Sequence, residues 1–148
     1  MEIADVLTEP RIALGVRVRD KQGLIAELAR LAAPHVPGVP AAEVTEKLLM
    51  REHLGSTGLG SGFALPHARL SGLDSFVGLF AALRRAVDFG SIDGKPVDMA
   101  FLLLIPESAT DHVAALAAIT RRFRDAELRA AVRSAAAPAD VLRILTQR

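Results

Sequence analysis

The most informative part of the sequence is a glycine-rich segment, REHLGSTGLGSGFALPHAR, at residues 51–69. It separates a helical pattern on its N-terminal side from a strand pattern on its C-terminal side. Four glycines and three hydroxyl residues lie between Gly55 and Gly62, so little side-chain bulk keeps a ligand away from the backbone amides. Such amides, together with serine and threonine hydroxyls, commonly bind phosphate. We expect an irregular loop that leads into a brief strand ending at Pro66-His67.

Two helices are predicted before this loop. The first follows an apolar stripe formed by Leu24, Ile25, Leu28, Leu31 and Ala32. A stretch rich in proline and glycine comes next, and Pro40 stands where a second helix begins, because the first turn of a helix needs no amide donor. That helix is expected to end near Arg51, directly before the glycine-rich loop.

Two strands and several helices are predicted after the loop. Phe76 to Leu83 and Val97 to Ile105 are apolar runs, and the second is nearly unbroken, as in a central strand covered on both faces. Their connection contains the turn pair Asp93-Gly94 and no helical pattern, which favours an antiparallel pair. After Pro106 we expect a helix capped by Ser108 or Thr110. This helix should carry Val113, Leu116, Thr120 and Phe123 on one side, and shorter helices should follow around Leu128–Val132 and Val141–Leu145.

This order of elements predicts an α/β fold, namely a single-domain sandwich with a mixed β-sheet flanked by helices on both faces. The chain has 148 residues, of which 51% are hydrophobic and 24% charged, and this balance suits one globular domain over residues 1–148.

Composition argues against several classes of function. The chain has no cysteine, which excludes disulfides and thiolate metal sites. Its formal net charge is +1, it has no tryptophan or tyrosine, and no basic stripe stands out, so we expect no nucleic-acid partner. The longest apolar run, Met99 to Ile105, is too short to cross a bilayer, and residues 1–5 lack the layout of a secretion signal. We therefore expect a cytoplasmic protein without membrane insertion.

Three side chains suit the chemistry of phosphoryl transfer. His67 follows the loop, and a neutral imidazole is a competent nucleophile near pH 7. Arg51 precedes the loop and offers a planar cation that matches phosphate oxygens. His112 is expected in the first turn of the helix after Pro106, where the helix dipole favours anions. Because all three lie near predicted ends of elements, folding can bring them to one rim of the sheet.

The segment at residues 51–69 resembles the active-site signature of the fructose/mannitol-type enzyme IIA family of the bacterial phosphotransferase system. Within that family, LGSTG at residues 54–58 is most similar to the nitrogen-regulatory branch. The resemblance extends to IADVL at residues 3–7, to FGSIDGKPVD at residues 89–98 and to Asp111-His112. Two positions depart from the pattern: Ser61 stands where many members have asparagine, and Ala68 where several have glycine.

The resemblance implies a single EIIA type-2 domain that works as a phosphocarrier without cofactor or metal. His67 would accept the phosphoryl group on Nε2 from an HPr-like phosphocarrier protein. Arg51 would pair with the phosphoryl oxygens, His112 would orient or stabilise the group, and Ser56 and Thr57 would complete the phosphate-binding cradle. The acceptor would be a IIB domain or a regulatory target protein.

Other functions remain open at this point. The first is a stand-alone IIA component of a fructose/mannitol-type sugar uptake system, which would need separate partners. The second is a non-catalytic regulatory domain that binds an anion or nucleotide at the same loop, although neither G-x-G-x-x-G nor a P-loop lysine is present. The third is a metal hydrolase built on His67, His112 and Asp111, which lacks a closely spaced ligand pair such as H-x-x-x-H.

Overall fold

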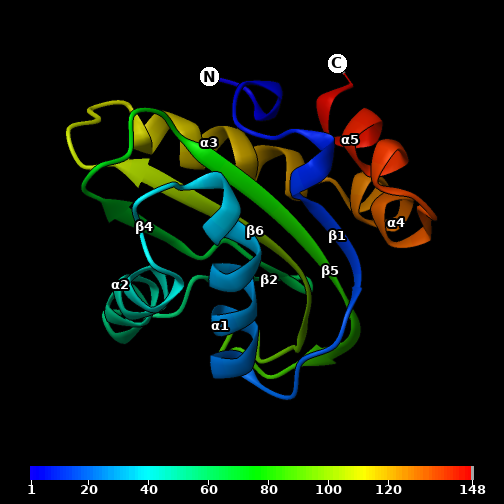
Figure 1. The fold of residues 1–148 in the computed structure, drawn as a ribbon. Helices are drawn as coiled ribbons and strands as arrows, with labels where there is room; N and C mark the ends of the chain where they lie inside the picture. The colour runs from blue at the N-terminus through cyan, green and yellow to red at the C-terminus, as the bar shows by residue number, and fades with distance from the viewer. Residues whose placement is uncertain (148) are drawn as a thin grey trace.

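A mixed six-stranded sheet forms the middle layer of the fold (Figure 1). The computed structural model describes residues 1–147. The strands run in the order β1-β5-β6-β3-β2 across the sheet, and β4 pairs with β6 off this path. Their bounds are β1 Ile12–Val16, β2 Gly58–Gly60, β3 Phe63–Ala64, β4 His67–Leu70, β5 Val77–Val87 and β6 Val97–Pro106.

Five α-helices cover the two faces of the sheet, as the sequence predicts. The helices α1 (Lys21–Ala32) and α2 (Ala41–His53) lie on one face. The helices α3 (His112–Phe123), α4 (Ala126–Ser134) and α5 (Pro138–Thr146) lie on the other. Short 3-10 helices occur at Ile3–Asp5, Glu9–Arg11 and Ala33–His35. Among residues 1–147, no helix has both the length and the apolar character needed to span a membrane.

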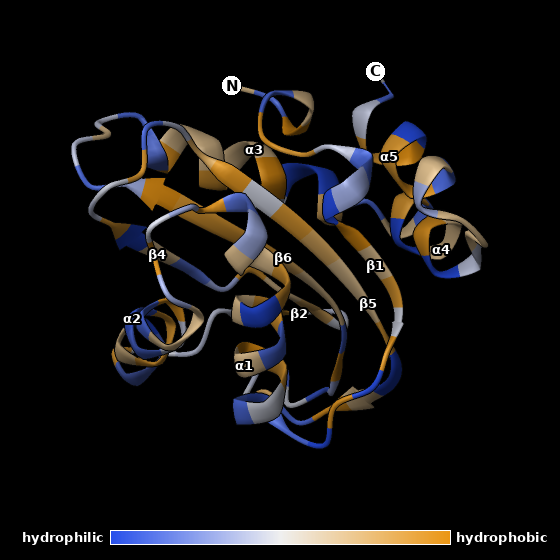
Figure 2. Ribbon diagram, in the orientation of Figure 1, coloured by the Kyte–Doolittle hydropathy of each residue, from blue (hydrophilic) through white to orange (hydrophobic). Residues whose placement is uncertain are grey.

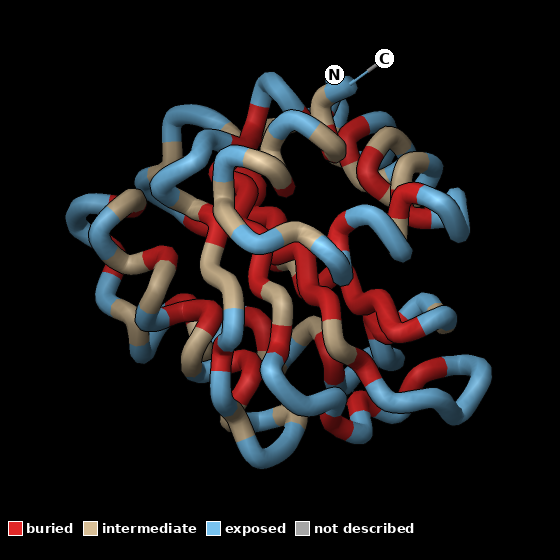
Figure 3. Tube along the Cα trace, turned by 90° about the vertical axis from the view of Figure 1, so that its right-hand side faces the viewer, coloured by how far each residue is buried: buried red, intermediate tan, exposed pale blue. Residues whose placement is uncertain are grey.

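Strand β6 joins the two halves of the core. Its even-numbered residues Ala100, Leu102 and Leu104 contact the core beneath α1 and α2. From Met99 to Ile105 its odd-numbered residues contact the core beneath α3, α4 and α5, and these are Met99, Phe101, Leu103 and Ile105. Side chains alternate between the faces of a strand, so a strand covered on both sides is apolar at every position. Figure 2 shows this central apolar band, and Figure 3 shows that it is buried.

Strands β5 and β6 are antiparallel, as predicted, with Phe80 opposite Phe101. The sheet is mixed because β1 runs parallel to β5, and β3 and β4 run parallel to β6. The sequence pattern missed β1. Only its two end residues, Ile12 and Val16, are buried, so the alternation that identifies a strand is too weak to read.

His67 begins strand β4 instead of ending a brief strand, which corrects the prediction for this segment. Strands β3 and β4 lie along the same side of β6, with Ala64 opposite Ala100 and His67 opposite Leu103. Pro66 interrupts them because it has no N–H to donate. Its carbonyl still accepts a hydrogen bond from the N–H of Leu103 at 3.0 Å. This interruption places His67 at the start of β4, directly after the conformationally rigid Pro66.

The predicted stripe of α3 is correct only in part, since Phe123 is buried and Leu116 packs against the core. Val113 is 67% exposed, whereas Ala115, Ile119 and Phe123 face the core. Phe123 sets this orientation, since its ring stacks on that of Phe63 with the centroids 4.1 Å apart. The stripe that continues from Phe123 at intervals of four residues consists of Ile119 and Ala115. The helix is preceded by Asp111 at the N-cap position, with no side-chain cap bond, and not by Ser108 or Thr110.

Ser61 has a backbone conformation that is unusual for a residue other than glycine. Its φ is 57°, between Gly60 at 100° and Gly62 at 82°. The main chain is held there from both sides. The N–H of Ser61 donates to Asp93 at 2.9 Å, and its carbonyl accepts from Arg133 at 3.0 Å. Asparagine tolerates this left-handed region better than serine does.

The conformation of Ser61 generates a stability prediction. Ser61→Asn should raise the free energy of unfolding by about 0.5 kcal/mol, and Ser61→Val should lower it by about 1 kcal/mol, because a β-branched residue is strained at positive φ. Urea denaturation of each variant measures these changes. Ser75→Asn and Ser75→Val, at an exposed loop residue without positive φ, are the matched controls. Equal effects at the two positions would contradict the prediction.

Candidate functional site

The ring of His67 is held by its own main chain. Its Nδ1 lies 2.8 Å from the carbonyl oxygen of Leu65. A carbonyl oxygen can only accept, so Nδ1 carries the hydrogen and the neutral ring keeps its lone pair on Nε2. The break at Pro66 makes this contact possible, because it turns the chain between Leu65 and the first residue of β4. The half-buried imidazole therefore presents Nε2 as its reactive nitrogen.

Arg51 meets that nitrogen, as the sequence led us to expect. It lies in the last turn of α2, and its Nε donates to Nε2 of His67 at 3.3 Å. Its Nη1 donates to the carbonyl oxygen of Gly55 at 2.9 Å, so the loop holds the guanidinium in place. Folding has brought together two side chains that are 16 residues apart, at the rim of the sheet beside β4.

The surroundings of His67 lower its pKa below the ordinary value. Burial is the main cause, because it penalises the charged imidazolium, and the positive charges of Arg51 and His112 act in the same direction. The bond to Leu65 and the negative charge of Glu52 oppose this shift. The net effect keeps the ring neutral at pH 7, which is the form that can act as a nucleophile.

His112 also lies at this site, close enough for its charge to affect the pKa of His67. It occupies the first position of α3, as predicted. The side chain that contacts it, Arg69, was not predicted from the sequence. The Nη2 of Arg69 lies 2.9 Å from Nδ1 and 3.2 Å from Nε2 of His112.

Ser56 and Thr57 use their hydroxyl groups within the protein. The Ser56 hydroxyl donates to the carbonyl oxygen of Phe89 at 3.0 Å and accepts from the N–H of Gly58 at 3.0 Å. Thr57 is 3% exposed, and its hydroxyl and its N–H both donate to the carboxylate of Glu52. These bonds shape the loop and fasten it to Phe89 and Glu52. Direct contact of either hydroxyl with a phosphoryl group stays a prediction.

Glu52 is a second residue that the sequence analysis missed. Its carboxylate is nearly buried and accepts from Lys21 at 2.8 Å, in addition to the bonds from Thr57. The Nζ of Lys21 also lies 4.5 Å from the centroid of the Phe89 ring. A signal was available in the sequence. Val44, Leu48 and Glu52 are spaced four residues apart, so they lie on the same buried face of α2.

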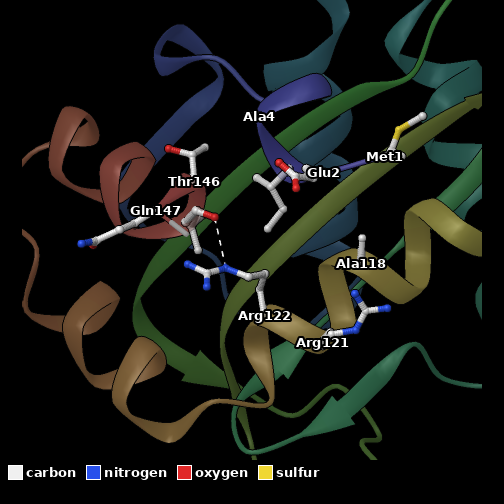
Figure 4. Close-up of a pocket in the computed structure, with 10 residues that line it drawn as sticks. Met1, Glu2, Ala4, Ala118, Arg121, Arg122, Thr146 and Gln147 are labelled. Carbon is white, nitrogen blue, oxygen red and sulfur yellow. Dashed lines mark hydrogen bonds between the residues drawn. The ribbon is translucent and has the colours of Figure 1, made fainter.

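A separate pocket of about 170 Å³ lies between the N-terminal residues, α3 and α5 (Figure 4). On one side Arg122 donates to the carbonyl oxygens of Ile144 at 2.6 Å and Leu145 at 3.3 Å, which caps the end of α5. None of the residues proposed above for phosphoryl transfer lines this pocket. Within residues 1–147, no group of three or more histidine, aspartate or glutamate side chains is arranged to hold a metal ion.

The chain is similar to known proteins along most of its length. Residues 5–148 match the protein family described as "Phosphoenolpyruvate-dependent sugar phosphotransferase system, EIIA 2". A nitrogen regulatory protein of Bradyrhizobium diazoefficiens is 45% identical over 129 residues, which cover 86% of this chain and 84% of that protein.

Two solved structures have the same fold. The nitrogen regulatory protein IIA-Ntr from Neisseria meningitidis superposes with a TM-score of 0.92 and 36% identity, over 97% of this chain and 99% of its own. The complex of enzyme IIAMTL with phosphorylated enzyme IIBMTL from Escherichia coli gives a TM-score of 0.79, over 96% of this chain and 98% of its own. Its identity is 19%, so it supports the fold alone.

The environment of His67 predicts its titration. The pKa of His67, followed by NMR of its ring protons, should lie below the ordinary value of about 6.5. Arg51→Met should raise this pKa, because it removes a nearby positive charge. Arg85→Met removes an exposed arginine of β5 and should leave the titration unchanged. A midpoint at or above 6.5 in the unmodified protein would contradict this account of the site.

The buried carboxylate of Glu52 predicts a loss of stability on truncation. Glu52→Ala leaves Lys21 and the donors of Thr57 without their acceptor, and it should lower the free energy of unfolding by about 2 kcal/mol. The loss should be smaller than for a fully buried pair, because Lys21, with 28% of its side chain exposed, can regain water. Thermal and urea denaturation test this. Glu27→Ala, which breaks an exposed pair with Arg30, is the control and should have a much smaller effect.

Proposed function

This chain belongs to the phosphotransferase system EIIA 2 family, and on that premise we propose that it carries a phosphoryl group on Nε2 of His67. One observation carries the proposal. The bond from Nδ1 to Leu65 leaves Nε2 as the nitrogen with the lone pair, and this nitrogen faces the guanidinium of Arg51. A nucleophile beside a fixed cation is what transfer of a phosphoryl group requires, since catalysis there consists mainly of positioning and charge stabilisation.

The transfer is a displacement at phosphorus. The lone pair of Nε2 forms the new N–P bond while the N–P bond of the donor phosphohistidine breaks and returns its electron pair to the donor nitrogen. Arg51 occupies the lone pair of Nε2 in the unmodified protein, so its Nε must leave that nitrogen before phosphorus arrives. The same guanidinium then pairs with the phosphoryl oxygens, which are better acceptors than a ring nitrogen.

The depressed pKa of His67 supports this role. A protonated ring has no lone pair with which to attack, so a low pKa keeps the nucleophile available as the pH falls below neutrality. The shape of the loop beside the site depends on the hydroxyl of Ser56 and on the contact between Thr57 and Glu52.

We infer the partners and the purpose from the relatives. The donor is an HPr-like phosphocarrier protein. The acceptor is a regulatory target protein or a IIB domain. Enzyme IIBMTL is the partner in the solved IIAMTL complex. The similarity to nitrogen regulatory proteins, at 45% and 36% identity, favours regulation over sugar uptake. Phosphorylation adds roughly two negative charges to this rim of the sheet, which is enough to change what binds there. We place this exchange in the cytoplasm.

Mass measurement tests the proposal. The protein, incubated with phosphoenolpyruvate, enzyme I and HPr or their nitrogen-branch counterparts, should gain the mass of one phosphoryl group. The bond should be labile in acid and stable in base, as expected of a phosphohistidine. His67→Ala should gain nothing, because no other ring in the site has its reactive nitrogen beside Arg51.

His35→Ala and His53→Ala are the matched controls, since both rings are outside the site, and both variants should be phosphorylated like the unmodified protein. Phosphorylation of His67→Ala would contradict the assignment of the nucleophile. Absence of any gain with both donor pairs would contradict the phosphocarrier function itself.

A further inference from the structure

A cavity of about 310 Å³ lies just beyond the last paired residues of β1 and β5. The residues that line it are Arg17, Val18, Arg84 and Arg85, so only Val18 is apolar. The volume is within the range of about 300–1,000 Å³ that is usual for small-molecule sites, but such sites are mostly lined by apolar and aromatic side chains. This cavity therefore suits a compact and strongly charged ligand.

The pairing of the two strands brings two of the arginines together. Strands β1 and β5 run parallel, with Val16 opposite Leu83, and Figure 1 shows these ends of the two strands side by side. The next residues along the strands are Arg17 and Arg84. Neighbouring strands lie less than 5 Å apart, and residues in register project to the same side of a sheet. Two guanidinium groups consequently meet at the same cavity.

An irregularity in β5 adds the third arginine. Arg84 and Arg85 are consecutive, so in a regular strand their side chains would point to opposite faces. The register of β5 against β6 shifts between Ala82 and Val87, and a shift of this kind redirects side chains. Both arginines line the cavity as a result.

The cavity has no counter-charge from the part of the chain that the structure describes. Within residues 1–147, Arg17, Arg84 and Arg85 form no ion pair and no side-chain hydrogen bond. The nearest acidic residues along the chain are Asp20 and Asp88, and both carboxylates accept from main-chain N–H groups close to them. Like charges on neighbouring strands are unfavourable, although solvent and salt weaken the effect at exposed side chains. An anion bound between them would remove this repulsion.

Arginines in other parts of the chain help to hold the fold together. Arg122 and Arg129 donate to carbonyl oxygens, and Arg133 donates to the carboxylate of Asp98. The formal net charge of the whole chain is only +1. The three positive charges at this cavity are therefore a local feature and not a consequence of a basic protein.

We propose that this cavity binds the diphosphate group of a small molecule. A single phosphate brings roughly two negative charges, and a second phosphate brings the total closer to the charge of three guanidinium groups. The oxygens of a tetrahedral phosphate point in several directions, which matches arginines that come from two strands. Each planar fork can bond two of these oxygens.

The cavity is distant from the proposed nucleophile. His67 lies opposite Leu103 of β6, whereas the cavity is near the end of β5 at which Val87 lies opposite Val97. Residues 97 and 103 of a strand are about 20 Å apart. The cavity is thus a second site, separate from the one at which the phosphoryl group is carried.

A titration with pyrophosphate tests the inference. In ¹H–¹⁵N NMR spectra of the unphosphorylated protein, pyrophosphate should shift the amide signals of residues 17–18 and 84–85, with a dissociation constant of about 1 mM or tighter. Arg84→Met should weaken this binding about tenfold, because it removes one charged fork. The double variant Arg17→Met and Arg84→Met should weaken it further. Arg124→Met removes an exposed arginine elsewhere and should leave the affinity unchanged.

Three comparisons identify the site and the ligand. In Arg51→Met, which lacks the guanidinium beside His67, pyrophosphate should still shift residues 17–18 and 84–85. Citrate should bind more weakly than pyrophosphate, because its carboxylates are planar and less densely charged than a diphosphate. ADP carries a diphosphate with a nucleoside attached and should shift the same amides. The relative affinity of ADP and pyrophosphate then shows whether a nucleotide or a free diphosphate is the better source of the group, and either order supports the site.

The result does not depend on the phosphocarrier function, since no enzyme I or HPr is present in the titration. Urea denaturation of Arg84→Met should show the same or slightly higher stability, because a like charge has been removed, so lost binding would not reflect a lost fold. The inference would be overturned by shifts confined to the surroundings of His67, by citrate binding as tightly as pyrophosphate, or by unchanged affinity in the double variant.

Discussion

The hydrogen bond between Nδ1 of His67 and the carbonyl of Leu65 controls the chemistry available at this site. It engages Nδ1 of the ring and leaves Nε2 with its lone pair directed toward Arg51. The bond forms where Pro66, between β3 and β4, interrupts the pairing of this segment with β6. The apolar strand β6 supports both short strands, so the buried sheet positions a half-exposed ring.

Charge around the site is arranged in two layers. Close to His67 lie the guanidinium of Arg51 and the ring of His112, both of which disfavour a further positive charge. Glu52 and Lys21 form a partly buried pair whose charges cancel. The pair stabilises the loop through Thr57, and the negative charge of Glu52 moderates the effect of the cations on His67. The loop geometry and the pKa of the proposed nucleophile therefore depend on the same carboxylate.

Elements that produce a local pattern of apolar residues could be predicted from the sequence. Most side-chain contacts between distant segments could not. The unbroken apolar run of β6 and the stripes of α1 and α2 report directly on burial. Strand β1 was not recognised because its middle residues are not buried. Val113 was placed wrongly in α3, because the buried face runs through Ala115 and Ile119 to Phe123 and leaves Val113 exposed. The meeting of Arg51 and His67 was predicted, because both were expected at ends of elements on one rim of the sheet. The contacts of Arg69 with residues 107–112 have no local signal at all.

A phosphocarrier must stabilise its phosphoryl group without trapping it. The group brings roughly two negative charges, and the arrangement supplies two guanidinium groups nearby, Arg51 and Arg69. Arg69 is already bonded to two carbonyl oxygens, so less of its hydrogen-bonding capacity remains for a phosphate. A guanidinium that is already engaged holds the phosphoryl group less tightly than a free one would, and this weaker hold allows the group to leave for the next acceptor.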